Sequence, residues 1–141
     1  MKDDLIFNLY LIARRFGKML KQAFVKAGYH YLPEHFTLLI MIHQNQKIKH
    51  TEISVNTYKS KATITRIIDK LVEDGLIEKR PDPKDRRSCF LHLTDKGKKL
   101  YAILIGIYLQ EEKRILQGVS QEAYDQCIRN VFFTIRRNMN C

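Results

Sequence analysis

The polar side chains best suited to bind a charged ligand lie in two neighbouring stretches between residues 60 and 94. The first stretch begins a predicted helix and presents Lys61, Thr63 and Arg66 on its polar face. The second is the loop PDPKDRR, which places two arginines at the tip of a predicted hairpin. A helix fits the major groove of a DNA duplex, and a basic hairpin can lie beside it. The two stretches therefore predict contacts with nucleic acid.

The elements that would position these side chains follow from the apolar pattern. A helix is expected over residues 60–74, because apolar side chains recur there at helical spacing, namely Ile64, Ile67, Ile68, Leu71 and Val72. Ser60 suits its N-cap, and Gly75 suits its end. Two short strands are expected over residues 77–80 and 88–94, and apolar and polar residues alternate along the second. The prolines and aspartates between them indicate a loop.

Five further helices are expected from the same periodicity and from capping residues. They are residues 3–27, a helix starting at Pro33, residues 50–57, and helices capped by Thr94 and Ser120. The sequence therefore predicts a mainly α fold of the α+β winged-helix type, with six helices and a two-stranded β-wing. A single domain over residues 1–141 would hold a winged helix-turn-helix core at about 33–99, flanked by dimerisation helices at about 3–27 and 95–140.

The charge of the chain supports a polyanionic partner. There are 25 Lys and Arg against 15 Asp and Glu, which gives a net charge of +10. Residues 45–100 hold 14 of these cations and 8 of the acids, so the excess is concentrated around the predicted helix and hairpin. Nucleic acid is a better match for such a surface than an acidic membrane.

Residues 52–97 resemble the DNA-binding core of the MarR family of bacterial transcription regulators. The matching runs are Glu52-Ile53-Ser54, Ser60 to Arg66, Asp69-Lys70-Leu71, Gly75-Leu76-Ile77, Asp82 to Arg87 and Leu93 to Gly97. The chain departs from the family pattern at Thr57, Tyr58 and Lys59, where an apolar, a small or glycine-like and another apolar residue are usual. The resemblance implies a dimeric regulator, most simply a repressor, that binds a pseudo-palindromic operator.

The resemblance also implies site residues. The helix at 60–74 looks like the recognition helix, with candidate DNA contacts at Ser60, Lys61, Thr63, Thr65 and Arg66. The candidate wing contacts are Lys84, Asp85, Arg86 and Arg87. Arg86 or Arg87 would enter the minor groove, held by a bidentate pair with Asp82 or Asp85. A small phenolic or anionic effector is a further implication, with candidate contacts at Tyr10, Arg14, Tyr29, Tyr31, His35 and Tyr108.

Other chemistries find less support in the sequence. The odd cysteine count favours a reducing cytosol over disulfides, and no signal peptide or membrane span is recognisable. Cys89 and Cys127 are expected in the core and Cys141 at an exposed terminus, which disfavours redox sensing. The five histidines form no ligand pair, so no metal site is expected. We also expect no cofactor and no enzymatic activity, because no catalytic motif is present.

Two alternative functions remain open at this stage. A winged domain can serve as a protein-interaction module, although a protein-binding surface is usually less charged at its centre. A non-specific DNA-binding protein would instead spread its charge over the whole surface, whereas residues 101–141 hold 5 cations against 4 acids. Both alternatives are weaker than a sequence-specific regulator of transcription.

Overall fold

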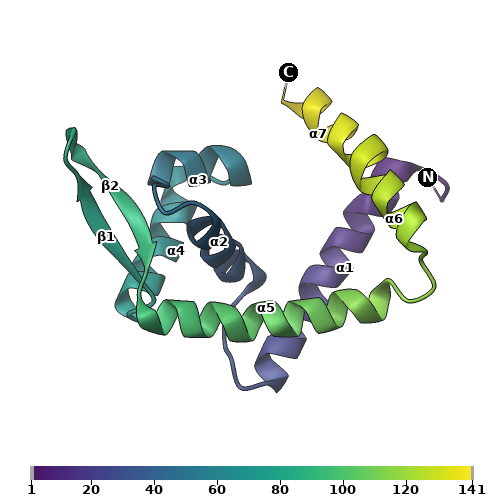
Figure 1. Cartoon of the computed structure of the whole chain (residues 1–141), viewed down its shortest axis with the longest axis horizontal. Helices are drawn as coiled ribbons and strands as arrows, with labels where there is room; N and C mark the ends of the chain where they lie inside the picture. Colours follow the sequence, from purple (N-terminus) through teal and green to yellow (C-terminus); the bar gives the residue numbers. More distant parts are fainter. Residues whose placement is uncertain (1, 141) are drawn as a thin grey trace. The chain divides into compact units, whose positions relative to one another are not determined.

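The computed structural model describes residues 2–140 and divides into two compact units. The first unit ends at Tyr108 and the second begins at Leu109. The helices of the first unit are α1 (Leu5–Lys26), α2 (Pro33–Gln44), α3 (His50–Thr57), α4 (Lys61–Glu73) and most of α5 (Asp95–Ile115). Its strands are β1 (Ile77–Asp82) and β2 (Asp85–Leu93), which form an antiparallel hairpin, the wing (Figure 1). The predicted mainly helical winged fold is confirmed.

The helices begin and end where local chemistry predicts. The Ser60 hydroxyl accepts a hydrogen bond from the Thr63 N–H at 3.2 Å, which caps α4. The Thr94 hydroxyl accepts one from the Gly97 N–H at 3.0 Å at the start of α5. Gly28 and Gly75 follow α1 and α4 with φ of 92° and 72°. These left-handed conformations end a helix at little cost for glycine.

The apolar core of the first unit lies where α1, α2, α4 and α5 meet. Phe24 of α1 and Phe36 of α2 are fully buried or nearly so, with ring centroids 5.5 Å apart in an edge-to-face arrangement. The stripe of α4 contributes Ile64, Ile67, Ile68 and Leu71, all buried. Burying one such side chain stabilises the fold by about 1.5–3 kcal/mol. The buried stripe therefore fixes which face of α4 points away from the core.

The wing is joined to the helices at its base. Leu76 and Ile77 are buried where β1 begins, and Leu91 and Leu93 are buried where β2 ends. On the other side of β2, Lys49 forms a β-bridge with Phe90, and the Leu91 N–H donates to the Ile48 carbonyl at 3.0 Å. The base of the hairpin is therefore held by apolar packing and by the segment that precedes α3.

The strands are longer than the sequence pattern predicts. They reach Asp82 and begin at Asp85, so only Pro83 and Lys84 remain between them instead of the whole loop PDPKDRR. The pairing shifts register between Pro81 and Asp82. Proline lacks an N–H and suits the irregular end of a strand, which is why two prolines did not shorten the hairpin as expected.

The second unit contains the end of α5, then α6 (Gln121–Gln126), a π-helical segment η1 (Cys127–Phe132) and α7 (Phe133–Met139). Ser120 caps α6 as predicted, its hydroxyl accepting from the Ala123 N–H at 3.1 Å. The expectation that Cys127 is a core residue is wrong for this single chain, because Cys127 is exposed and α6, η1 and α7 bury no side chain. Cys141 lies outside the described residues.

No helix between residues 2 and 140 is both long enough and apolar enough to cross a membrane.

Candidate nucleic-acid interface

The start of α4 presents polar groups away from the core. Lys61, Thr65 and Arg66 are exposed, while Thr63 is half-buried. The Ser60 hydroxyl also donates to the Thr63 hydroxyl at 2.9 Å. Because the first N–H groups of a helix lack partners within it, this end also offers backbone donors. Amide donors and two cations at one helix end suit phosphates and base edges.

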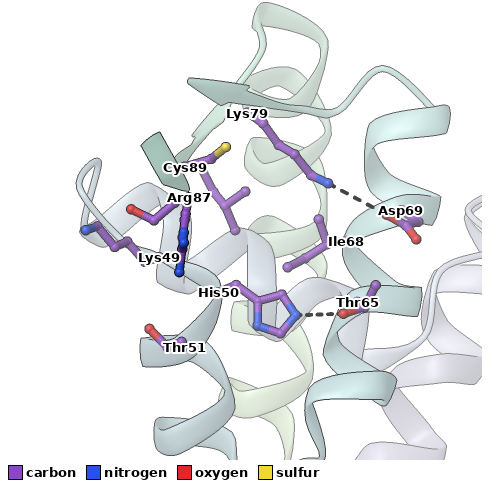
Figure 2. Close-up of a pocket in the computed structure, with 11 residues that line it drawn as sticks. Lys49, His50, Thr51, Thr65, Ile68, Asp69, Lys79, Arg87 and Cys89 are labelled. Atoms are coloured by element: carbon purple, nitrogen blue, oxygen red, sulfur yellow. Dashed lines mark hydrogen bonds and ion pairs between the residues drawn. The ribbon is translucent and has the colours of Figure 1, made fainter. Parts of the chain in front are cut away.

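The side chains of α4 that we expect to contact DNA differ in whether they already have a partner within the chain. The Thr65 hydroxyl lies 2.8 Å from His50 Nε2, so it is tied to the first turn of α3 (Figure 2). The side chains of Lys61 and Arg66 make no ion pair or hydrogen bond with any other residue that the structure describes. Two cations are therefore available to an external anion, whereas the hydroxyls are partly engaged.

The tip of the wing is closed by its aspartates. Asp82 Oδ1 accepts a hydrogen bond from the Lys84 N–H at 2.9 Å, and Asp85 Oδ1 accepts one from the Arg87 N–H at 3.0 Å. The predicted bidentate pairing of either aspartate with an arginine side chain is wrong. Aspartate readily bonds to the N–H two residues on, and at this turn the backbone is the nearer partner. Lys84, Arg86 and Arg87 are exposed as a result.

An ion pair that the sequence did not reveal fixes the wing against α3. Lys49 Nζ lies 2.7 Å from Asp82 Oδ2, and the Asp82 side chain is only 8% exposed. The hydrogen bond from Lys49, helped by the Lys84 N–H, lowers the pKa of Asp82, and the same bond raises the pKa of Lys49. Lys49 Nζ also lies 5.1 Å from the centre of the Phe90 ring. The pair therefore joins the N-cap of α3 to the point where the wing turns.

A cavity of about 280 Å³ separates α4 from the wing. Figure 2 shows Arg87, Cys89 and Lys79 of the wing on one side of it, with His50 and Thr65 facing them. Its cations are Lys49, Lys79 and Arg87, and its one carboxylate, Asp69, lies 3.8 Å from Lys79. The helix and the wing thus border one positively charged hollow.

Cys89 lines this cavity and is exposed, so its expected place in the core is wrong. The alternation of β2 predicts two faces for the strand but does not show how far the helices cover each face. Leu91 and Leu93, on the same face, are buried, whereas Cys89 lies beyond the covered part of the wing.

The six candidate effector contacts fall into separate groups. Arg14 donates to the Tyr10 hydroxyl at 3.0 Å along α1. Tyr31 and His35 form an edge-to-face pair at the start of α2, and the Tyr31 hydroxyl donates to Asp74 at 3.0 Å. Tyr29 packs against the core, and the Tyr108 ring contacts Phe16 and Phe36.

Tyr31 and His35 have packing roles that account for their burial. Burial and the bond to Asp74 raise the pKa of Tyr31 to about 12. Burial lowers the pKa of His35, whose Nδ1 accepts from the Leu32 N–H at 2.9 Å. That bond requires an unprotonated Nδ1 and supports the first turn of α2.

Among residues 2–140, no three metal-binding side chains lie close enough together to hold an ion.

Comparison with known proteins is consistent with this geometry. Residues 33–89 match the family model described as "MarR family". The chain is 30% identical to the uncharacterized HTH-type transcriptional regulator YkoM of Bacillus subtilis, over 86% of this chain and 80% of that protein. It is 21% identical to the HTH-type transcriptional repressor YetL of Bacillus subtilis, over 89% of this chain and 75% of that protein.

A solved structure shares the fold. The crystal structure of a MarR family transcriptional regulator from Listeria monocytogenes, complexed with 26mer DNA, superposes with a TM-score of 0.84 at 21% identity. The match covers 97% of this chain and 89% of that one.

Proposed function

The chain belongs to the MarR family of transcriptional regulators, and we propose that it binds double-stranded DNA with α4 in the major groove and the wing in the adjacent minor groove. The members of this family are regulators of transcription, not enzymes. The observation that carries the proposal is the cavity that α4 and the wing share. Thr65 of α4 and Arg87 of the wing line it together, so the two elements border one hollow that a single duplex could reach.

Within this proposal the residues have different roles. Lys61 and Arg66 are the charged contacts of α4, because neither has a partner among the described residues. Ser60, Thr63 and Thr65 supply hydroxyls near the helix start. Phosphate contacts set the register of the helix on the duplex, and lysine or arginine contacts to guanine read sequence.

The residues of the wing also have different roles in this proposal. Arg86 and Arg87 are the minor-groove candidates, because the groove's negative potential attracts guanidinium groups. Lys84 adds a phosphate contact at the turn. Asp85 carries a charge that phosphates repel, so its contribution is the hydrogen bond to the Arg87 N–H that shapes the tip.

We further propose that two copies bind a pseudo-palindromic operator. One helix and one wing read too few base pairs to select a site in a genome, and two-fold symmetry adds a second half-site at a fixed spacing. Exposed apolar side chains support such pairing, including Ile6 and Ile12 of α1 at 58% each and Phe133 of α7 at 65%. Surfaces of this kind on the terminal helices are suited to a large apolar interface.

Repression by blocking access to a promoter is the simplest consequence of such binding. One relative, YetL, is named a transcriptional repressor. A small phenolic or anionic effector stays a prediction. Thermal-shift screening with aromatic acids would test it, and a screen in which none raises Tm would count against an effector of that class.

The direct test is selection of bound DNA from a random pool, followed by a salt titration. A regulator yields a palindromic consensus. A steep salt dependence without a consensus would instead indicate a non-specific DNA-binding protein, and no binding would favour a protein-interaction module.

Lys61→Ala sharpens this test. It should weaken binding to the selected site and reduce the salt slope by about 1 for each lost phosphate contact. Lys21→Ala removes an exposed lysine from α1 and is the matched control. Equal affinities for the two variants would contradict the role of Lys61.

A further inference from the structure

A small hollow outside the proposed DNA interface brings together hydrogen-bond donors from α2, the wing and α5. This basal hollow has a volume of about 90 Å³. Its polar lining consists of His43, Gln46, Arg80, His92 and Lys98, and the buried Ile42 and Leu93 complete it. None of the residues that line it is acidic. The basal hollow therefore offers donors and positive charge, which suits an anion.

The strands of the wing separate the basal hollow from the cavity shared with α4. On β1, Lys79 lines that cavity, whereas the next residue, Arg80, lines the basal hollow. On β2, Leu91 lines the cavity and His92 lines the basal hollow. Consecutive side chains of a strand point to opposite faces. A ligand in the basal hollow would therefore be separate from DNA bound along α4.

The two cations of the basal hollow have donors to spare. The Lys98 side chain makes no ion pair or hydrogen bond with any other residue that the structure describes. Arg80 bonds to Glu78 through Nε and Nη2, which leaves its Nη1 without a partner among residues 2–140. Glu78 offsets part of the charge of Arg80, so Lys98 supplies the unpaired positive charge.

The two histidines add donors of a different kind. His92 is half-buried, and this burial is the main reason why its pKa is lowered. Its ring is therefore neutral near pH 7 and offers one N–H. The His43 ring stacks on Tyr101 of α5, with ring centroids 4.2 Å apart. This stacking holds one wall of the hollow in place before any ligand binds.

The size and the donors of the basal hollow favour a phosphoryl group. Sites for drug-sized molecules measure about 300–1,000 Å³, so a hollow this small suits a compact group. A phosphoryl group has three strong acceptor oxygens in a tetrahedral arrangement. Guanidinium and ammonium groups form charge-assisted hydrogen bonds with such oxygens. Donors that converge from three elements can reach more oxygens of a tetrahedral phosphate than of a planar carboxylate.

We propose that the basal hollow binds the phosphoryl group of a soluble anion, either inorganic phosphate or a small phosphomonoester. Lys98 and Arg80 supply the charge, and the neutral side chains around them supply further N–H donors. Because the hollow joins α2, the wing and α5, a bound phosphate would hold the wing against the two helices. This proposal does not depend on the proposed function.

Thermal denaturation of the full-length protein with inorganic phosphate tests the proposal, at an ionic strength kept constant with chloride. Tm should rise along a saturating curve, by roughly 3–6 °C at ten times the Kd. Lys98→Ala should lose most of this rise. Lys99→Ala is the matched control, because Lys99 is exposed on the same helix and does not line the hollow.

The control also removes a general effect of phosphate. Phosphate stabilises many proteins because it is excluded from their surfaces, and both variants share that effect. An equal rise of Tm in the two variants, or a rise that does not saturate, would overturn the proposal. Glycerol 1-phosphate in place of inorganic phosphate identifies the source, since the anion with the lower Kd is the better match.

NMR of the histidine rings at constant pH locates the anion. The imidazole signals of His43 and His92 should shift with the same phosphate dependence as Tm. His30 is exposed elsewhere in the first unit, so its signal is the control and should not move. Equal shifts of all three signals would contradict a site in the basal hollow.

Operator binding distinguishes a soluble anion from a phosphate of the DNA backbone. Lys98→Ala and Lys99→Ala should bind the selected operator equally, because the basal hollow lies on the face of the wing opposite the α4 cavity. A larger loss for Lys98→Ala would indicate a backbone phosphate in the hollow and overturn the soluble source. Since phosphate binding is measured without DNA, failure of the wild type to bind any operator would overturn the proposed function alone.

Discussion

The base and the tip of the wing are parts of one hairpin with opposite chemistry. At the base, Leu76, Ile77, Leu91 and Leu93 are buried against the helices. At the tip, Lys84, Arg86 and Arg87 are exposed, and their side chains bind no other residue between positions 2 and 140. The comparison indicates that buried packing is concentrated at one end of the hairpin, while the proposed DNA contacts lie at the other. Substitutions along it should therefore affect different measurements.

The largest loss of stability is expected at the base, from Gly97→Ala. A Cβ at position 97 would lie 1.9 Å from the Leu76 carbonyl oxygen and 2.9 Å from the Leu76 carbonyl carbon. Backbone atoms cannot give way as a flexible side chain can, so α5 and β1 must separate. We expect the free energy of unfolding to fall by about 2–4 kcal/mol, measured by urea denaturation.

Gly106→Ala is the matched control, because it makes the same substitution on the same helix. A Cβ there meets no other atom within 4 Å. Alanine favours a helix interior over glycine by about 0.5–1 kcal/mol, so this variant should be at least as stable as the wild type. A Gly97→Ala protein of unchanged stability would show that the base of the wing is not closely packed.

An intermediate effect is expected between base and tip, at Asp82. Asp82→Asn keeps an oxygen that can accept from the Lys84 N–H but removes the charge that binds Lys49. A lost negative charge beside DNA should by itself strengthen binding. If the ion pair positions the wing, binding should instead weaken, by roughly twofold to fivefold. Operator affinity of the variant therefore distinguishes positioning from simple electrostatics, and tighter binding would contradict positioning.

The pH dependence provides a second measurement on this pair. The pKa of Asp82 is lower in the folded protein than in the unfolded chain, chiefly because of Lys49. The stabilisation by the pair is therefore complete above the unfolded pKa, near 4, and is lost as pH falls through the lower, folded pKa. Asp82→Asn should remove this contribution. The difference in stability between wild type and variant should thus shrink as the pH falls below about 4, and a constant difference would contradict the assignment.

Local and long-range contacts differ in how far the sequence could predict them. The caps Ser60 and Thr94, the stop at Gly75 and the apolar spacing of α4 are local signals, so periodicity and capping rules located α4 and the start of α5. The Lys49–Asp82 pair joins residues 33 positions apart. Local patterns do not show which distant cation a carboxylate will meet, and this is why Asp82 was assigned to an arginine.

Exposure was harder to predict than secondary structure. The alternation along β2 correctly placed Cys89 and Leu91 on one face, but only Leu91 is covered. In the second unit, the helical periodicity of α6 to α7 did not predict the π-helical segment, and Cys127 is exposed in the single chain. Burial depends on what packs against a face, which neither pattern specifies.

The smallest change in stability is expected at the tip, from Arg86→Ala. The side chain is exposed and has no partner among the described residues, so the free energy of unfolding should stay within about 0.5 kcal/mol of the wild type. Operator binding should nevertheless weaken, by roughly tenfold, with a shallower salt dependence. Arg80→Ala is the control, because Arg80 is an exposed arginine of the same hairpin whose side chain pairs with Glu78. If the two variants lose affinity equally, the wing acts through its net charge. A larger loss for Arg86→Ala, at unchanged stability, would show that the tip makes a specific contact while the base holds it in place.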